Sequence, residues 1–134
     1  MKSHPGATPG KVQVIPEISS ELQTVLSSLA LDKVRRHFIF CAGPKCCSTE
    51  EGEAVWKHVK ARMVEQKVKE SGVFRTKAAC LRVCREGPIA LVYPEGVWYR
   101  LASKEACDRI IDEHLIGGRP VTEFIISVSP LPGK

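Results

Sequence analysis

Several features that mark common protein classes are missing from this chain. No apolar run approaches the length of a membrane-spanning helix. The first residues, MKSHPGATPG, lack the apolar core of a secretory signal peptide. Aromatic residues make up only 6% of the chain, and no nucleic-acid-binding motif, internal repeat or low-complexity segment is visible. These absences predict a cytoplasmic protein with no membrane span and no nucleic-acid partner.

Cysteine, by contrast, is plentiful. The chain has six cysteines in 134 residues, and in a reducing compartment these are more often metal ligands than disulfides. A secreted disulfide scaffold would be smaller and denser in cysteine. Five of the six fall into two clusters, Cys41 with Cys46 and Cys47, and Cys80 with Cys84. Two thiol groups far apart in sequence are a common way to surround one metal centre, so we expect a four-thiolate site.

The net charge of +5 is concentrated around the cysteines. Between Lys45 and Arg85 there are ten Lys or Arg and five Asp or Glu, whereas the rest of the chain has ten of each kind. Nearby cations stabilise an anionic iron–sulfur centre and favour its reduction. We expect Arg75, Lys77, Arg82 and Arg85 either to tune the reduction potential of such a centre or to bind an acidic partner protein. A solvated basic surface is the alternative.

The first half of the chain predicts a leader, two helices and a strand. Residues 1–16 are rich in Pro and Gly, and residues 18–31 have apolar side chains at helical spacing. His37–Phe40 is a short apolar strand that leads directly into the first cysteine. A helix then begins at Ser48 or Thr49, with glutamates in its first turn, and is expected to end at Gly72. Its predicted inward stripe is Trp56, Val59 and Met63.

The second half predicts strands before a last helix. Residues 73–76 are a strand, and the strands at 89–93 and 97–100 flank the turn Pro94-Glu95-Gly96. A helix capped by Ser103 runs to Leu115 and is stopped by two glycines, and an extended apolar segment follows. Its predicted inward residues are Cys107, Ile110, Ile111, His114 and Leu115. This order, βαβ followed by ββα, is the layout of a thioredoxin-like α/β fold with a central sheet of about four strands and flanking helices.

Three thiol chemistries fit two separated cysteine groups to different degrees. A thioredoxin dithiol needs two cysteines separated by two residues, and neither cluster has that spacing. Structural zinc accepts four thiolates, but its usual knuckles are tighter and support folds with little core. A [2Fe-2S] cluster needs two ligands for each iron, and two separated pairs meet that need.

The motifs FCAGPKCC, RTKAACLRVCREGPIALVYPEGVWY and IIDEHLIGGRPV resemble the thioredoxin-like [2Fe-2S] ferredoxins, and more distantly the thioredoxin-like cluster subunit of respiratory complex I. The match runs from about His37 to Ile126. The resemblance implies a one-electron carrier, often a homodimer, that exchanges electrons with redox partner proteins and has no substrate chemistry of its own. It predicts three parts: residues 1–33, a leader with a short helix; 34–128, the ferredoxin domain; and 129–134, a frayed tail.

The resemblance also implies the ligands. Cys41 and one of Cys46 and Cys47 would hold one iron, and Cys80 and Cys84 the other, with backbone N–H groups donating to the sulfurs. The gap in the complex I relatives favours Cys46. The family's apolar pair, eight and nine residues after its second ligand, falls on Val55 and Trp56 when counted from Cys47. Since the loop varies in length and the helix is rigid, we prefer Cys47.

The other cysteine and the histidines are expected to be structural. Cys107 lies on the apolar face of a helix and is assigned to the core. A Rieske-type centre would need two histidine ligands, and His4, His58 and His114 are instead given ordinary roles. Two alternatives to a free electron carrier stay open: a non-redox binding module with zinc or an inert cluster, and an electron-transfer subunit of a larger oxidoreductase.

Overall fold

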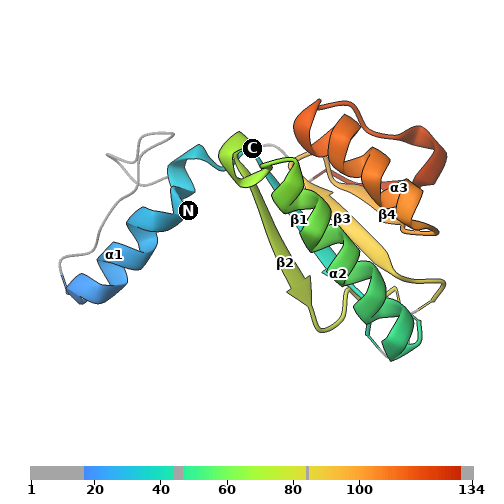
Figure 1. Cartoon of the computed structure of the whole chain (residues 1–134), viewed down its shortest axis with the longest axis horizontal. Helices are drawn as coiled ribbons and strands as arrows, with labels where there is room; N and C mark the ends of the chain where they lie inside the picture. The colour runs from blue at the N-terminus through green and yellow to red at the C-terminus, as the bar shows by residue number, and fades with distance from the viewer. Residues whose placement is uncertain (1–16, 44–46, 84, 131–134) are drawn as a thin grey trace. The chain divides into compact units, whose positions relative to one another are not determined.

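A computed structural model describes residues 17–43, 47–83 and 85–130. The chain divides into two compact units, Met1–Val34 and Arg35–Lys134. Unit 1 contains helix α1 (Ser20–Leu29), drawn in blue in Figure 1. Ser19 caps this helix, because its hydroxyl accepts a hydrogen bond from the Leu22 N–H at 3.1 Å. No residue of α1 is buried.

Unit 2 is built on one sheet of five strands in the order β2-β1-β3-β4-β5. β1 (Arg36–Cys41) and β2 (Val73–Ala78) are parallel. β3 (Ile89–Tyr93), β4 (Val97–Arg100) and β5 (Ile125–Val128) each run antiparallel to the preceding strand in this order. The predicted hairpin is confirmed at both of its strands. The fifth strand comes from the extended apolar segment near the C-terminus, which pairs with β4 at the edge of the sheet.

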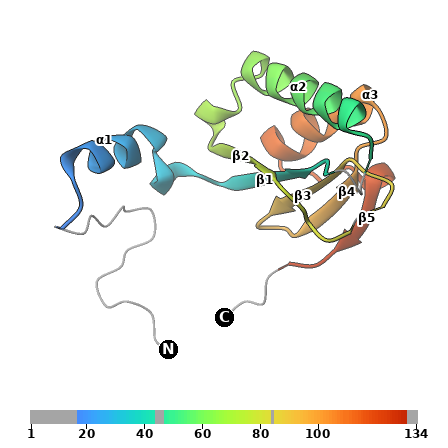
Figure 2. The ribbon, with the colours of Figure 1, turned by 90° about the horizontal axis from the view of Figure 1, so that it is seen from below.

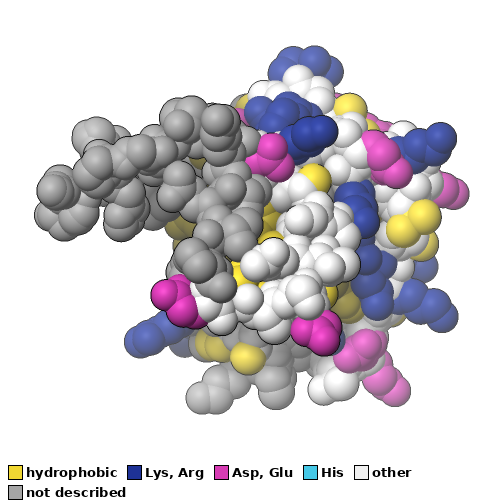
Figure 3. Space-filling view, turned by 90° about the vertical axis from the view of Figure 1, so that its left-hand side faces the viewer, with side chains coloured by type: hydrophobic (Ala, Val, Ile, Leu, Met, Phe, Trp, Pro, Cys, Tyr) yellow, Lys and Arg dark blue, Asp and Glu magenta, His cyan; other side chains and the backbone are white. Residues whose placement is uncertain are grey.

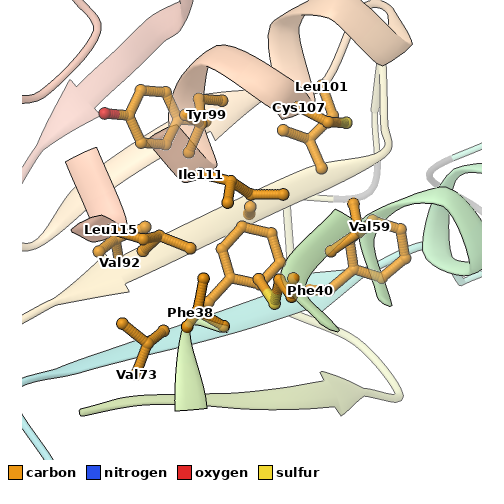
Figure 4. Close-up of a cluster of buried hydrophobic side chains, with 14 of the residues drawn as sticks. Phe38, Phe40, Val59, Val73, Val92, Tyr99, Leu101, Cys107, Ile111 and Leu115 are labelled. Atoms are coloured by element: carbon orange, nitrogen blue, oxygen red, sulfur yellow. The ribbon is translucent and has the colours of Figure 1, made fainter. Parts of the chain in front are cut away.

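Both helices of unit 2 lie on the same face of this sheet (Figures 1 and 2). They are α2 (Thr49–Glu65) and α3 (Lys104–Arg109), and α3 continues as a π-helical segment, Ile110–Ile116. Their apolar sides pack onto Phe38 and Phe40 of β1, which are fully buried (Figure 4). The rest of the buried cluster includes Val59, Met63, Val92, Tyr99, Leu101, Cys107, Ile110, Ile111 and Leu115.

The prediction that the helix after the cysteines ends at Gly72 is wrong. α2 ends at Glu65, and a left-handed Lys67 (φ 54°) turns the chain. The turn places Val68 in the core at 2% exposure, with its N–H donating to the Met63 carbonyl at 3.1 Å. A helix continued to residue 72 would lose this reversal, so burial of one valine outweighs the helical pattern of the segment. Gly72 (φ 81°) instead ends a short 3-10 turn.

A buried polar chain holds the hairpin turn against the end of the last helix. The Val121 N–H donates to the Tyr99 hydroxyl at 3.0 Å, and this hydroxyl donates to Nδ1 of His114 at 2.8 Å. The order of donors follows from the Glu95 end, because an ionised carboxylate only accepts, so Nε2 of the neutral imidazole carries the hydrogen and Nδ1 is the acceptor. Nε2–H of His114 therefore donates to Glu95 at 3.1 Å, and Arg36 donates two bonds to the same carboxylate at 3.1 and 2.9 Å. His114 has no exposed surface, so the predicted structural role has a definite set of partners.

Candidate metal centre

The first predicted ligand, Cys41, lies at the end of a central strand. β1 alternates between core-facing phenylalanines and residues of the opposite face, and Cys41 is its last residue, with no exposed surface. It pairs with Ile89 of β3 on one side and with Ala78 of β2 on the other. Strand pairing on both sides therefore fixes where this thiol lies.

The parallel pairing of β1 and β2 brings the second cysteine cluster to the same edge of the sheet. Cys80 follows Ala78, the register partner of Cys41, by two residues. The Leu81 N–H donates to the Cys41 sulfur at 3.4 Å, and the Arg82 N–H donates to the Cys80 sulfur at 3.2 Å. The loop after β2 thus lies against the end of β1. The sequence predicted N–H donors to the sulfurs, and the structure identifies two residues that supply them.

Arg82 has a backbone conformation that L-residues rarely adopt. Its φ is 74°, in the left-handed region that favours glycine. This turn directs its N–H back to the sulfur two residues earlier. Strained residues of this kind gather at functional sites, where the surrounding structure holds them. No sequence signal identifies this position, because arginine carries no preference for a left-handed turn.

Cys47 stands at the start of α2, directly before the cap. Ser48 caps the helix by accepting a hydrogen bond from the Glu51 N–H at 3.1 Å, which confirms the predicted start. The Cys47 thiol is partly buried, and burial raises its pKa, with the charges of Glu51 and Cys41 raising it further. The charge of Cys41 therefore reaches the Cys47 thiol across the gap between β1 and the start of α2.

Two glycines allow the three segments of the site to approach closely. A Cβ on Gly43 would lie 2.8 Å from the Ala79 carbonyl oxygen in the loop after β2. A Cβ on Gly52 would lie 2.5 Å from the Ala42 Cβ and 3.4 Å from the Cys47 sulfur. Contacts below 3.0 Å force a shift of the neighbouring atoms. The first glycine therefore permits contact between the two cysteine loops, and the second permits contact between a loop and α2.

Gly52→Ala is expected to destabilise the holoprotein by about 1–3 kcal/mol and to lower its retention of metal, because the added methyl overlaps Ala42. At an open helix position the same change would stabilise by about 0.5–1 kcal/mol, since alanine favours helix. Urea unfolding and iron content measure the two effects. Ala54→Val adds bulk at an exposed position of the same helix and is the control. A more stable Gly52→Ala variant would contradict the close contact.

Two of the five clustered cysteines, Cys46 and Cys84, lie outside the described residues. Within the described ranges, no group of three or more His, Cys, Asp or Glu side chains lies close enough to hold a metal ion. The described residues thus bring Cys41, Cys47 and the Cys80 loop to one edge of the sheet. The choice between Cys46 and Cys47 stays a prediction.

Cys107, His58 and the predicted basic residues lie in the core or at the surface. Cys107 is 2% exposed within the hydrophobic core (Figure 4), and burial, followed by the charge of Asp108, raises its pKa to about 12. It is a core thiol, as expected from the sequence. His58 contacts Asp108 at 2.8 Å on the side of α2 that faces α3. Among the predicted basic residues, Arg75, Lys77, Arg82 and Arg85 are exposed, and Lys77 pairs with Glu53 at 3.1 Å.

Solved structures with the same arrangement of elements are thioredoxin-like [2Fe-2S] ferredoxins from Aquifex aeolicus. One matches with a TM-score of 0.63 and 28% identity over 75% of this chain and 98% of its own. A 1.5 Å crystal structure of the wild-type Aquifex protein matches with a TM-score of 0.60 and 27% identity, over 70% of this chain and 98% of its own. No protein-family model matches the chain.

Among curated proteins, a putative 2Fe-2S ferredoxin of Priestia megaterium is 30% identical over 96 residues, which are 72% of this chain and 73% of the relative. The chain belongs to the thioredoxin-like [2Fe-2S] ferredoxins. A 2Fe-2S ferredoxin of Aquifex aeolicus is 43% identical over 58 residues, 43% of this ferredoxin and only 52% of the relative. A 2Fe-2S ferredoxin of Clostridium pasteurianum is 28% identical over 69% of this chain and 96% of its own. The family and the fold class predicted from the sequence are thereby confirmed.

No helix in the described part of this ferredoxin is both long and apolar enough to cross a membrane.

Proposed function

We propose that this ferredoxin carries single electrons on a [2Fe-2S] cluster held by Cys41, Cys47, Cys80 and Cys84. The observation that carries the proposal is the hydrogen bond from the Leu81 N–H to the Cys41 sulfur, at 3.4 Å. It joins the end of the first predicted ligand segment to the loop of the second. Family membership supports the cofactor, since the relatives are named 2Fe-2S ferredoxins.

The residues of this chain would hold the cluster and tune it. A bound [2Fe-2S] cluster would supply one-electron redox chemistry, taking one electron from a donor and passing it to an acceptor. The Leu81 and Arg82 N–H groups would donate to ligand sulfurs, and such bonds stabilise the extra negative charge of the reduced state. Cys41 is buried and would keep water from the iron that it holds, whereas Cys80 is exposed. Exposure on that side suits electron exchange with a second protein.

Cys47 is preferred over Cys46 as the second ligand. The Cys47 sulfur lies against the side of α2 that has no side chain at Gly52, next to Ala42, the neighbour of Cys41. The charge of Cys41 is among the causes that raise the Cys47 pKa. Both observations support a position beside the first ligand. Cys46 remains the alternative ligand, as a neighbour able to replace Cys47.

The cofactor is tested on protein purified without oxygen. We expect a coloured protein that contains iron and acid-labile sulfide in equal amounts, with no EPR signal when oxidised and a one-electron signal after dithionite. Iron analysis, visible absorption and low-temperature EPR measure these properties. A colourless protein with stoichiometric zinc would overturn the proposal. A coloured protein that dithionite does not reduce would instead favour a non-redox binding module.

Partners and assembly are also proposals. The donor and acceptor would be redox proteins, either free or as neighbours in a larger oxidoreductase, and the cytoplasmic location predicted from the sequence stays a prediction. Self-association is supported by a row of apolar residues paired across three strands, in which partly exposed Ile39 and Trp98 lie on either side of buried Leu91. The alternation of β1 places this row on the sheet face opposite Phe38 and Phe40, where neither α2 nor α3 lies (Figure 2). Sedimentation equilibrium of the holoprotein distinguishes a monomer from a dimer.

A further inference from the structure

The two sides of α2 differ in how their cations are paired. On the side toward α3, Arg62 contacts Asp112 at 2.9 Å and Asp108 at 3.6 Å, and His58 contacts Asp108 at 2.8 Å. The basic groups of this side therefore have carboxylate partners. They contribute little net positive charge to the surface.

The side of α2 toward β2 is basic and largely unneutralised. The ion pair between Glu53 and Lys77 connects the helix to β2 at 3.1 Å. Lys57 and Lys60 follow Glu53 by four and seven residues, so they lie on the same side of the helix. Lys57, Lys60 and Arg75 are exposed, and no carboxylate in the described parts of the chain pairs with them. We call Lys57, Lys60, Arg75 and Lys77 the basic flank.

The residues of the basic flank are positioned by ordered elements of the fold. The Lys60 ammonium lies 5.8 Å from the centre of the Trp56 ring, and that ring stacks on Phe40 of the core at 4.9 Å. Arg75 and Lys77 belong to β2, whose pairing with β1 fixes their spacing. Figure 3 shows Lys and Arg side chains lying side by side as a band on part of one face of the molecule. The positive charge is therefore gathered on ordered elements.

The basic flank begins beside the cysteine site. Lys77 precedes Ala78, the register partner of Cys41, and Cys80 follows within three residues. On the helix, Glu53 is next to Gly52, whose missing side chain faces the Cys47 sulfur. A protein that docks on this flank would also come close to the exposed Cys80 loop.

We propose that the basic flank docks an acidic surface of a redox partner and thereby brings that partner's electron-accepting group to the cluster edge. This inference rests on the proposed function. A four-thiolate [2Fe-2S] centre is itself negatively charged, so an acidic partner would be repelled there without neighbouring cations. Complementary surface charge also raises association rates and fixes orientation. A nucleic acid suits this surface less well, because the aromatic ring of the flank is packed on the core and covered by Lys60.

The test uses reduced holoprotein and two model electron acceptors, cytochrome b5 as an acidic haem protein and cytochrome c as a basic one. One electron passes from the reduced cluster to the ferric haem, which becomes ferrous. Stopped-flow absorption gives the second-order rate constant at increasing salt. With cytochrome b5 we expect the rate to fall by roughly fivefold or more as salt rises from low to physiological strength. Lys57→Glu with Arg75→Glu is expected to lower the low-salt rate by about tenfold.

The control is Lys67→Glu with Lys69→Glu, which makes the same change in net charge near the turn before β2, at the end of the strand away from Cys80. It is expected to keep at least about half of the wild-type rate with cytochrome b5. The flank variant should also react faster with cytochrome c, whereas a damaged protein would slow with both acceptors. EPR and the reduction potential of each variant verify an unchanged cluster.

Three results would overturn the docking surface. Equal losses in the flank and control variants would show an effect of net charge alone. A rate with cytochrome b5 that does not depend on salt would exclude electrostatic docking. Salt-sensitive binding of a single-stranded oligothymidine that the flank variant loses, with electron transfer unchanged, would assign the flank to nucleic acid. These outcomes leave the cluster in place, so they are distinct from failure of the proposed function, which would appear earlier as a protein without a reducible cluster.

Discussion

Replacing Cys41 by alanine is expected to abolish the cluster, with iron content and visible absorption below roughly a tenth of the wild-type values. The buried thiol is held by strand pairing on both sides, and no other described thiol lies at that position on β1. Cys80→Ala and Cys84→Ala should have the same effect. Cys84→Ser, which leaves an oxygen donor, should bleach or destabilise the centre.

The matched control for these variants is Cys107→Ala. This residue is as buried as Cys41, but it belongs to α3 and faces the hydrophobic core, so its loss should cost about 1 kcal/mol of stability and leave the spectrum unchanged. If Cys107→Ala and Cys41→Ala bleach equally, the ligand assignment is wrong. Comparing Cys46→Ala with Cys47→Ala settles the disputed ligand. We expect Cys46→Ala to keep the wild-type spectrum and iron content. Cys47→Ala should either lose the cluster or show a changed spectrum in which Cys46 replaces Cys47, and the double variant should lose the cluster.

His114→Leu is expected to lower the free energy of unfolding by about 2–4 kcal/mol. The histidine has no exposed surface and joins the Tyr99 hydroxyl to the Glu95 carboxylate. Leucine would leave the hydroxyl without its acceptor and the carboxylate with Arg36 as its remaining side-chain donor. Urea unfolding of the holoprotein at pH 7.5 measures the loss.

His58→Leu is the comparison for that variant, because it removes a histidine–carboxylate contact near the surface. Its contact with Asp108 is partly exposed, so the change should be below about 1 kcal/mol. Similar losses of unfolding free energy in both variants would show that the buried hydrogen bonds of His114 stabilise the fold no more than the surface contact does. In either variant, an unchanged EPR spectrum would show that the loss of stability does not come from damage to the cluster site.

The buried hydrogen bonds of His114 and Glu95 also predict how the stability of the fold changes at acidic pH. Burial lowers the pKa of His114 from 6.5, with Arg36 acting in the same direction and Glu95 opposing it. The unfolded chain therefore takes up a proton first as pH falls through 6.5, and stability is lost from there toward the lower folded pKa. For Glu95, burial raises the pKa, but the bonds from Arg36 and His114 outweigh it and leave the pKa below 4.5. A second loss of stability then follows below pH 4.5, and His114→Leu should remove the first loss while retaining most of the second.

At alkaline pH, Tyr99 of the same hydrogen-bonded group determines the change in stability. Burial raises the pKa of its phenol to about 12 from 10.0, so the unfolded chain ionises first. Stability is therefore lost as pH rises above 10.0. These three side chains consequently contribute most to stability near neutral pH, where His114 is uncharged and Glu95 is ionised.

Much of the fold could be read from local patterns. Short apolar segments on both sides of the Pro94-Glu95-Gly96 turn predicted the strands of the hairpin, and the serines before α2 and α3 predicted their caps, because these signals depend only on neighbouring residues. The end of α2 could not be read in this way. It depends on Val68 reaching a core built from residues distant in sequence, which outweighs local helix preference.

The sequence by itself determined the cysteine clusters, the excess of positive charge around them and, through the family's motifs, the ferredoxin family. Only the tertiary structure decided which thiols approach one another and which backbone groups serve them. Parallel pairing of β1 with β2 brings Cys41 to the Cys80 loop, and Gly43 and Gly52 let the segments close. The physical reason is that spacing along a chain limits only neighbouring residues, whereas contact between residues about forty positions apart depends on strand register and on space left by missing side chains.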